Sequence, residues 1–317
     1  MSNTINKALI TGGNGNIGRL VGEQLLRRGI EVVKFDIPGT EPESVESGET
    51  VVVGDIRDQA LLRGLIEEHR PDTIYHLASL LSGSSEANLD AAWEINASAS
   101  FHLLQLAKEF GVNSFFFAST IATFGSDIAD PMPEDTQQWP ANIYGATKVA
   151  VERLGVYFKL THGLDFRCLR FPLVFSPFAP ASAVTAFPSH AFRAACQGES
   201  FTFPVSPTTG MSSMLLEDVI QGIVVFSLAN RETLSQHVYS LHGYHVTAEE
   251  VAMEIKSRIP AFSYTFEPQS SVDALLNAWP NVTIDETARR DWGWKPEYDF
   301  QASADWLMDY FTRQGNA

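Results

Sequence analysis

The chain has 317 residues, 44% of them hydrophobic and 19% charged, which is enough apolar material for a large folded core. Its 38 acidic and 22 basic residues give a formal net charge of −16, which argues against nucleic acids and membranes as partners. The first residues lack the features of a signal peptide, and no apolar run is long enough to span a bilayer, so we expect a cytoplasmic protein. No Cys-x-x-Cys pair occurs, and we predict no metal site.

Short apolar runs rich in β-branched and aromatic residues alternate with helical patterns through the first half of the chain. We expect six strands, at residues 7–11, 31–35, 50–54, 73–78, 114–119 and 166–171. We expect helices between them at residues 17–28, 58–69, 89–110 and 142–162. Repeated strand–helix–strand units predict an α/β fold with a Rossmann-type, doubly wound parallel sheet that carries helices on both faces.

The alternation weakens in the second half. Residues 172–190 contain four prolines and no Asp, Glu, Lys or Arg, which predicts an apolar loop lying over a pocket. We therefore expect a first domain at residues 1–171 and mainly a smaller C-terminal α/β sub-domain at residues 172–317, with parts of 210–245 returning to the first domain. The two tryptophans of the segment DWGW (291–294) are expected to pack within the smaller sub-domain.

The motif TGGNGNIG (11–18) follows the first predicted strand and leads into the first predicted helix. Its spaced glycines, Gly12, Gly15 and Gly18, let the backbone turn tightly and approach a pyrophosphate closely. The helix that follows presents free N–H groups and the positive end of its dipole to phosphates. This position between strand and helix favours a dinucleotide site over a plain turn.

Two carboxylates follow the next two strands. Asp36 ends the second strand, where it can accept hydrogen bonds from ribose hydroxyls and repel a 2′-phosphate. No arginine occurs at residues 37–39, so the sequence favours NAD over NADP. Asp55 ends the third strand, and it could contact the adenine amino group or cap the helix that starts near Asp58.

Tyr144 and Lys148 stand four residues apart on a predicted helix, so they lie on one face, one turn from each other. A nearby ammonium stabilises a phenolate and lowers the pKa of the tyrosine, which makes it a usable general base for a substrate hydroxyl. Ser119 and Thr120 lie at the end of the fifth strand, where ligands bind in open parallel sheets, and each offers a hydroxyl for the substrate oxygen. The order glycine loop, acid, hydroxyl and Tyr-x-x-x-Lys favours a proton-transfer pair over ordinary helix surface.

In this order of motifs the chain resembles the extended short-chain dehydrogenases/reductases, the NAD-dependent epimerase/dehydratase family. The matching motifs are TGGNGNIG (11–18), Asp36, GDI (54–56), HLAS (76–79), Asn96, STIATFG (119–125), YGATK (144–148) and LRFP (169–172). The resemblance implies that Tyr144 is the catalytic base, that Lys148 is its partner and that Thr120 is the catalytic hydroxyl. It implies NAD contacts from Gly12, Gly15, Asn16, Ile17, Gly18, Asp36, Asp55, Ile56, Leu77, Ala78, Ser79, Asn96, Tyr144, Lys148 and Pro172. Residues 1–171 would then bind NAD.

Residues 76–96 and 278–300 are similar to the short-chain type of L-threonine 3-dehydrogenase, which oxidises a β-hydroxyl with NAD and without a metal. This resemblance implies that the substrate meets Ser82, Thr120, Tyr144 and Trp279. The segment LRFPLVFSPFAPASAVTAF (169–187) departs from the glycine- and threonine-rich stretch of that family. A threonine-like β-hydroxy amino acid is therefore the first expected substrate, and a small sugar acid is the second. The superfamily also implies a homodimer through helices 89–110 and 142–162.

Two other functions remain as alternatives. A nucleotide-sugar epimerase or dehydratase with tightly bound NAD would use the same scaffold, but Arg193 is the only Arg or Lys in residues 172–230 to meet a diphosphate. A non-catalytic dinucleotide sensor ranks last, because Tyr144, Lys148 and a hydroxyl partner are all present.

Overall fold

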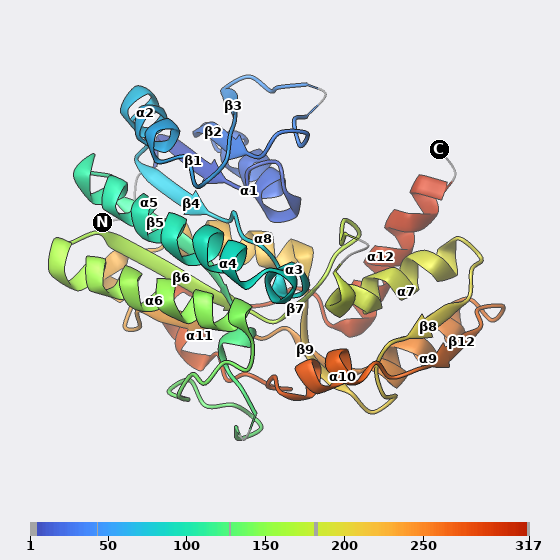
Figure 1. The fold of residues 1–317 in the computed structure, drawn as a ribbon. Coiled ribbons are helices and arrows are strands. Elements are labelled where there is room, and N and C mark those ends of the chain that lie inside the picture. Colours follow the sequence, from blue (N-terminus) through green and yellow to red (C-terminus); the bar gives the residue numbers. More distant parts are fainter. Residues whose placement is uncertain (1–4, 43, 127, 181–182, 316–317) are drawn as a thin grey trace.

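The computed structural model describes residues 5–42, 44–126, 128–180 and 183–315. Within these residues, seven strands form one parallel sheet in the order β10-β6-β5-β4-β1-β2-β3 (Figure 1). The strands are β1 (Lys7–Thr11), β2 (Glu31–Asp36), β3 (Glu49–Val53), β4 (Thr73–His76), β5 (Ser114–Thr120), β6 (Asp165–Phe171) and β10 (Val238–Ser240). The first six fall on the six predicted segments.

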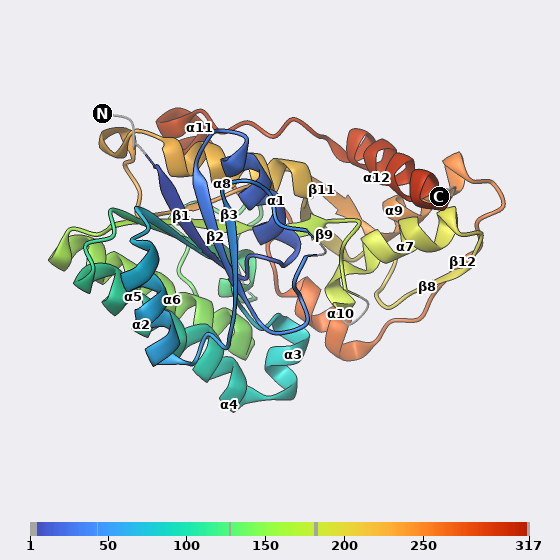
Figure 2. The ribbon, with the colours of Figure 1, turned by 90° about the horizontal axis from the view of Figure 1, so that it is seen from above.

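Helices cover both faces of this sheet (Figure 2). One face carries α1 (Asn16–Leu26), α8 (Leu216–Leu228) and α11 (Glu286–Trp292), and the other carries α2 (Gln59–His69), α5 (Ala99–Glu109) and α6 (Ile143–His162). Apolar side chains on consecutive strand positions explain the two layers, because a strand covered on both faces buries every residue. All seven residues of β6 are buried. The doubly wound fold predicted from the sequence is confirmed.

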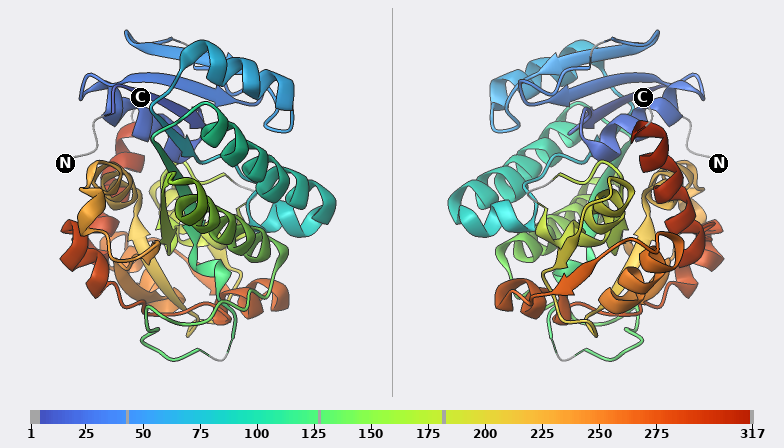
Figure 3. Two further views of the ribbon diagram at one scale, coloured as in Figure 1. Left: turned by 90° about the vertical axis from the view of Figure 1, so that its left-hand side faces the viewer. Right: turned by 90° about the vertical axis from the view of Figure 1, so that its right-hand side faces the viewer.

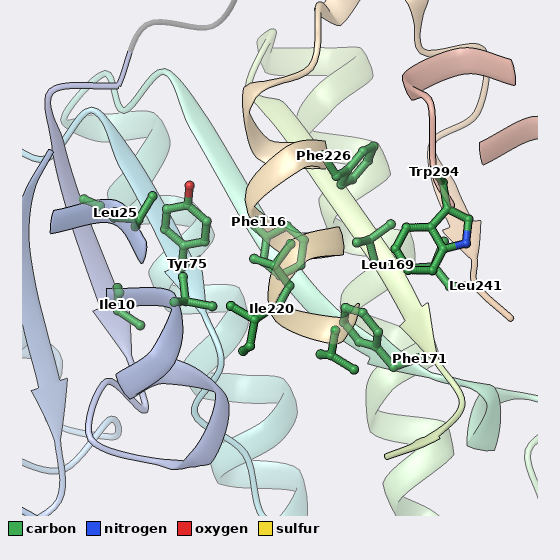
Figure 4. Close-up of a cluster of buried hydrophobic side chains, with 14 of the residues drawn as sticks. Ile10, Leu25, Tyr75, Phe116, Leu169, Phe171, Ile220, Phe226, Leu241 and Trp294 are labelled. Atoms are coloured by element: carbon green, nitrogen blue, oxygen red, sulfur yellow. The ribbon is translucent and has the colours of Figure 1, made fainter. Parts of the chain in front are cut away.

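A continuous core joins the sheet to α1 and α8 (Figure 4). Ile10 and Phe116 from the strands pack against Ile220 and Phe226 from α8, and each such buried side chain contributes about 1.5–3 kcal/mol. Trp294 belongs to this same cluster, and so does Trp292. The expectation that both tryptophans pack in the smaller sub-domain is therefore wrong: α11 returns to the sheet and buries them against α8 and β10.

The helical run predicted at residues 89–110 is interrupted. It consists of α4 (Leu89–Ala92), a π-helical turn η1 (Trp93–Ser98) and α5, and a short helix α3 (Ser82–Ala87) precedes it. The π-helical turn shifts the side chains that follow it relative to a regular α-helix. This turn carries Asn96 in its interior.

The apolar segment at residues 172–190 is not a plain loop. It contains the strand β7 (Leu173–Phe175) and the turn η3 (Val184–Ala186), and α7 (Phe187–Cys196) begins inside it. Two of its four prolines sit where proline is tolerated, since Pro172 precedes β7 and Pro188 lies in the first turn of α7. In the described parts of this segment, residues 172–180 and 183–190, regular elements and buried apolar side chains therefore occur where a loop is predicted.

A second core of buried apolar side chains lies at the other end of the molecule, and the right-hand view of Figure 3 shows the backbone of this end with the red C-terminal helix toward the viewer. It combines a three-stranded sheet, β11-β9-β7, and a two-stranded sheet, β12-β8, with helices around them. The further elements are β8 (Phe201–Phe203), β9 (Gly210–Leu215), β11 (Tyr244–Thr247), β12 (Tyr264–Phe266), α9 (Ala248–Arg258), α10 (Ser270–Asn277) and α12 (Phe300–Gly315). Among the described residues, no helix combines the length and hydrophobicity that a membrane span requires.

Candidate active site

The order of the strands locates a ligand crevice. β1 lies between β2 and β4, so the chain reverses direction across the sheet at the β1–β4 boundary. Ligands of open parallel sheets bind beyond the carboxyl ends of the strands at such a point. The glycine motif follows β1, residues 77–80 follow β4, and Thr120 ends β5, so the predicted site residues share this edge.

Two positions of the glycine motif, Gly12 and Gly18, have no room for a side chain. A side chain on Gly12, whose φ is +70°, would place Cβ 2.8 Å from the amide nitrogen of Ala78. A Cβ on Gly18 would lie 2.1 Å from the carbonyl oxygen of Gly12. These approaches hold the start of α1 against the loop and leave the backbone open toward the crevice.

Polar atoms of this loop lack partners within the described protein. Both side-chain amide atoms of Asn14 and Oδ1 of Asn16 are buried without a hydrogen bond. Buried polar groups are almost always paired, so this set fits a polar ligand such as a dinucleotide pyrophosphate. The side chain of Ile17 lies partly buried at the start of α1 and packs onto the core of the sheet.

Asp36 lies beside the glycine loop. Its Oδ2 accepts a hydrogen bond from Asn14 N (2.9 Å), and its Oδ1 accepts one from Ile37 N (2.8 Å). The carboxylate is therefore fixed at the end of β2 next to the loop. Its unused lone pairs are available to ribose hydroxyls.

Of the two roles open to Asp55, helix capping is excluded. Asp58 caps α2, because its carboxylate accepts a hydrogen bond from Leu61 N (3.0 Å). The side chain of Asp55 instead pairs with Arg57, whose hydrogen bond lowers the pKa of the Asp55 carboxyl. Ile56 next to it is buried, while Asp55 remains partly exposed at the crevice edge.

The side chain of Asn96 holds the loop after β4 through hydrogen bonds. The Asn96 side chain accepts from Leu80 N (2.8 Å) and from Ser79 Oγ (3.1 Å) and donates to the Leu80 carbonyl (3.0 Å). Its buried amide thus orients the backbone at residues 77–80, which includes the predicted contacts Leu77, Ala78 and Ser79. In this arrangement Asn96 is a positioning residue for the loop.

Tyr144 and Lys148 lie in the first two turns of α6, which begins at Ile143 directly after its N-cap residue Asn142. The Asn142 side chain caps the helix by accepting from Gly145 N (2.6 Å). Lys148 is buried, and its Nζ donates to the carbonyl oxygen of Ala118 on β5 (2.9 Å). Its Nζ also lies 5.5 Å from the centre of the Tyr144 ring. The two side chains therefore share one site, as their spacing predicts.

Burial moves the two pKa values in opposite directions. Loss of water raises the pKa of Tyr144 to about 12 and lowers the pKa of Lys148 to about 8. The Glu152 carboxylate opposes the shift of Lys148 by favouring its charge. The expectation that the ammonium lowers the tyrosine pKa is wrong for the protein alone, because burial of the phenol raises this pKa.

A cavity of about 150 Å³ opens beside Tyr144. The residues predicted from the sequence that line it are Ser82, Thr120, Tyr144, Pro172 and Trp279. Five further lining residues belong to the segment 172–190, which is predicted from the sequence to lie over a pocket: Leu173, Val174, Ala183, Thr185 and Ala186. Sequence reasoning missed the other four, which are Leu81, Gly83, Ser84 and Ile121.

The described lining of the cavity contains no charged side chain. Five of the lining residues carry a hydroxyl group, and most of the others are apolar; the five are Ser82, Ser84, Thr120, Tyr144 and Thr185. Its volume lies below the roughly 300–1,000 Å³ of sites for drug-sized ligands. The described residues also contain no group of three or more His, Cys, Asp or Glu side chains that could hold a metal ion.

The geometry suits acid–base chemistry on an alcohol or carbonyl oxygen. A phenol and a second hydroxyl line one small cavity, and a buried ammonium lies behind the phenol. The adjoining crevice presents glycine backbone, unpaired amides and a carboxylate, which fit a dinucleotide.

Comparison with known proteins points the same way. A family model described as the NAD dependent epimerase/dehydratase family matches residues 8–241. The mitochondrial L-threonine 3-dehydrogenase of Sus scrofa is 32% identical over 307 residues, which cover 96% of this chain and 82% of that protein. The holo form of an L-threonine dehydrogenase from Cupriavidus necator has 29% identity and a TM-score of 0.89, covering 96% of this chain and 99% of the other. A UDP-glucose 4-epimerase from Thermotoga maritima, 21% identical with a TM-score of 0.85 over 98% and 100% of the two chains, shares the fold.

Proposed function

The chain belongs to the NAD-dependent epimerase/dehydratase family and is an NAD-dependent oxidoreductase, and from this premise we propose that it oxidises a secondary alcohol on a small polar acid. The first choice of substrate is an L-threonine-like β-hydroxy amino acid, and the second is a small sugar acid. The observation that carries the proposal is the convergence of Ser82, Thr120, Tyr144 and Trp279 on one small cavity beside the cofactor crevice.

Each residue of the cavity has a role in this reaction. Tyr144 takes the proton of the substrate hydroxyl, and Thr120 donates a hydrogen bond that orients the same oxygen. NAD, when bound, supplies the carbon that accepts the hydride from the carbinol carbon. Burial alone disfavours the phenolate of Tyr144, so the proton transfer needs positive charge near the phenol. Lys148, fixed by the Ala118 carbonyl, supplies a positive charge there.

The division of labour along the chain is also part of the proposal. Residues 1–171, with β10 paired to β6 and α8 packed on the sheet, form the cofactor-binding part. Residues 172–317 mainly form the substrate-binding part, and β7 and η3 contribute Leu173, Val174 and Thr185 to the cavity wall.

We further propose a homodimer through the outer face of α4, η1, α5 and α6. Large apolar side chains are exposed there, namely Leu89, Trp93, Phe101, Tyr157 and Leu160. Contiguous exposed apolar side chains mark interaction surfaces. Sedimentation velocity of the protein and of a Trp93→Arg/Leu160→Glu variant tests this: a dimer that becomes a monomer supports it, and a monomeric parent excludes it.

A substrate screen tests the catalytic proposal. NADH formation is followed with L-threonine, other β-hydroxy amino acids, and aldonic and uronic acids at several pH values, and turnover of at least one is expected. Nucleotide sugars are included as a second arm. Interconversion of a nucleotide sugar without net NADH, together with silence toward all hydroxy acids, would replace the proposal by the epimerase alternative.

A further inference from the structure

Glu152 is a fully buried carboxylate on the catalytic helix. It stands one turn after Lys148 and two turns after Tyr144 on α6, and its relative exposure is 0%. Four hydrogen bonds converge on it. Ser119 Oγ donates at 2.5 Å, Gln138 Nε2 at 2.9 Å, and Arg170 donates from Nε at 2.9 Å and from Nη2 at 2.6 Å.

The donors come from the elements that carry the site. Ser119 directly precedes Thr120 at the end of β5, and Arg170 stands on β6 two residues before Pro172, which lines the cavity. Arg170 also lies 5.2 Å from the centre of the Phe124 ring. A displacement of the Glu152 carboxylate would therefore move α6, β5 and β6 relative to one another.

Glu152 and Arg170 are an ion pair removed from water. Such a pair is retained only when the two charges satisfy each other, and the loss of one partner leaves a buried charge uncompensated. The bidentate geometry of the guanidinium on the carboxylate fixes the distance and the angle of the pair.

The side chains around Lys148 leave Glu152 as its charged neighbour. Tyr144 and Glu152 face it from α6, Cys168 from β6 and His76 from β4, while β5 supplies the Ala118 carbonyl and the Phe117 ring. Burial raises the pKa of Cys168 well above its usual range and lowers the pKa of His76 to about 3, so both are neutral near pH 7. Glu152 favours the charge of Lys148, and Arg170 is the ion partner of Glu152.

We propose that Glu152 and Arg170 are positioning residues of the active site: they align Thr120 with Tyr144, and they set the charge of Lys148 through opposite effects, the carboxylate favouring the ammonium and the paired guanidinium offsetting the carboxylate. The inference rests on the proposed function, because it assigns Lys148 a role in the reaction. Its distinctive consequence is that loss of either partner changes the charge state of Lys148, in opposite directions.

Two single variants and their combination test this. The protonation of Lys148 Nζ is followed by NMR on protein labelled with ¹⁵N-lysine, with Lys148→Met identifying the signal. Glu152→Gln is expected to move this titration, and the matching limb of the kcat/KM profile, by about 1 to 3 pH units to lower pH. Arg170→Met is expected to move both to higher pH, and the double variant to lie near the parent.

Controls and contrary outcomes separate the inference from the proposed function. Glu109→Gln, which alters an exposed carboxylate paired with Arg63, is expected to leave the Lys148 titration unchanged. Equal shifts in both single variants, or no shift in either, would overturn the inference. If a single variant does not fold, the double variant still decides: a Lys148 titration shifted by more than one unit in it contradicts the proposal. Opposite shifts without any substrate turnover would leave the positioning pair in place and refute the proposed function instead.

Discussion

Tyr144 and Lys148 are the residues on which the proposed chemistry depends, and burial in the fold disfavours the charged form of both side chains. The phenol is held neutral by a pKa near 12, and the ammonium is weakened by a pKa near 8. Active sites commonly bury ionisable groups and thereby shift their pKa values. Variants of the two residues can separate the effect of this burial on stability from its effect on activity.

Tyr144→Phe removes the hydroxyl and keeps the ring. We expect kcat to fall by about 10²- to 10⁴-fold, because proton transfer by a positioned side chain contributes roughly that factor. The dissociation constant of NAD, measured by calorimetry, should change little. Tyr157→Phe on the exposed side of the same helix is the matched control, and equal losses in the two variants would contradict the assignment of Tyr144.

Lys148→Met should stabilise the protein at neutral pH. The pKa of Lys148 falls from 10.5 to about 8 on folding, so the folded state binds fewer protons between these values and the free energy of unfolding of the parent rises with pH there. Below pH 8 the buried ammonium costs the parent on the order of 3 kcal/mol, which the variant avoids.

Urea unfolding at pH 7 and at pH 10 checks this. The variant is expected to be more stable than the parent at pH 7, and the gap should shrink toward pH 10. Lys108→Met, which changes an exposed lysine on α5, should show no such pH-dependent gap. A stability gap that widens with pH would mean that folding raises the pKa of Lys148, which would contradict the prediction.

At the scale of elements, the glycine loop and α1 behave as one steric unit. Gly18 in α1 lies so close to the Gly12 carbonyl that a side chain at this position would collide with the loop. α1 has no side-chain cap at Gly15, so its first N–H groups stay available to a ligand. The motif can be recognised in the sequence, but the contact between Gly12 and Ala78 depends on the neighbouring strand β4, which Ala78 follows.

Gly18→Ala should weaken NAD binding. Its Cβ would meet the Gly12 carbonyl oxygen at 2.1 Å, so the loop must shift. We expect the dissociation constant of NAD, measured by fluorescence titration, to rise by at least tenfold, which corresponds to ~1.4 kcal/mol. Gly64→Ala is the control: that glycine sits in α2 with open space around it, and the helix should gain about 1 kcal/mol without any change in NAD affinity.

At the scale of the whole molecule, distant segments close the site together. Residues 130–134, which follow β5, form hydrogen bonds with residues 281–287, and we call this contact the clasp. Met132 N donates to the Val282 carbonyl (2.7 Å), and Thr287 N donates to Glu134 Oε1 (2.8 Å). Trp279 lies just before residues 281–287 and lines the cavity, so we expect this contact to hold the tryptophan in the cavity wall.

Glu134→Ala should therefore raise the KM for the substrate. Two hydrogen bonds to Thr287 are lost, one from its amide and one from its hydroxyl, and an increase of up to about tenfold is expected. NAD affinity should stay within twofold of the parent, since the clasp is remote from the glycine loop. Asp135→Ala at the exposed neighbouring position is the control. An equal loss of NAD affinity would show that the clasp acts on the whole molecule and not on the cavity.

The sequence by itself determined the local parts of this protein. Strand and helix periods, the glycine spacing and the four-residue step from Tyr144 to Lys148 are local properties, so the Rossmann-type sheet and the pairing of those two side chains could be predicted. Tertiary structure decided what depends on distant partners. Packing against α8 drew Trp292 and Trp294 to the main sheet, and burial reversed the expected pKa shift of Tyr144. An apolar segment forms a strand or a loop according to what covers it, so only the fold could show residues 172–190 as β7, η3 and the start of α7.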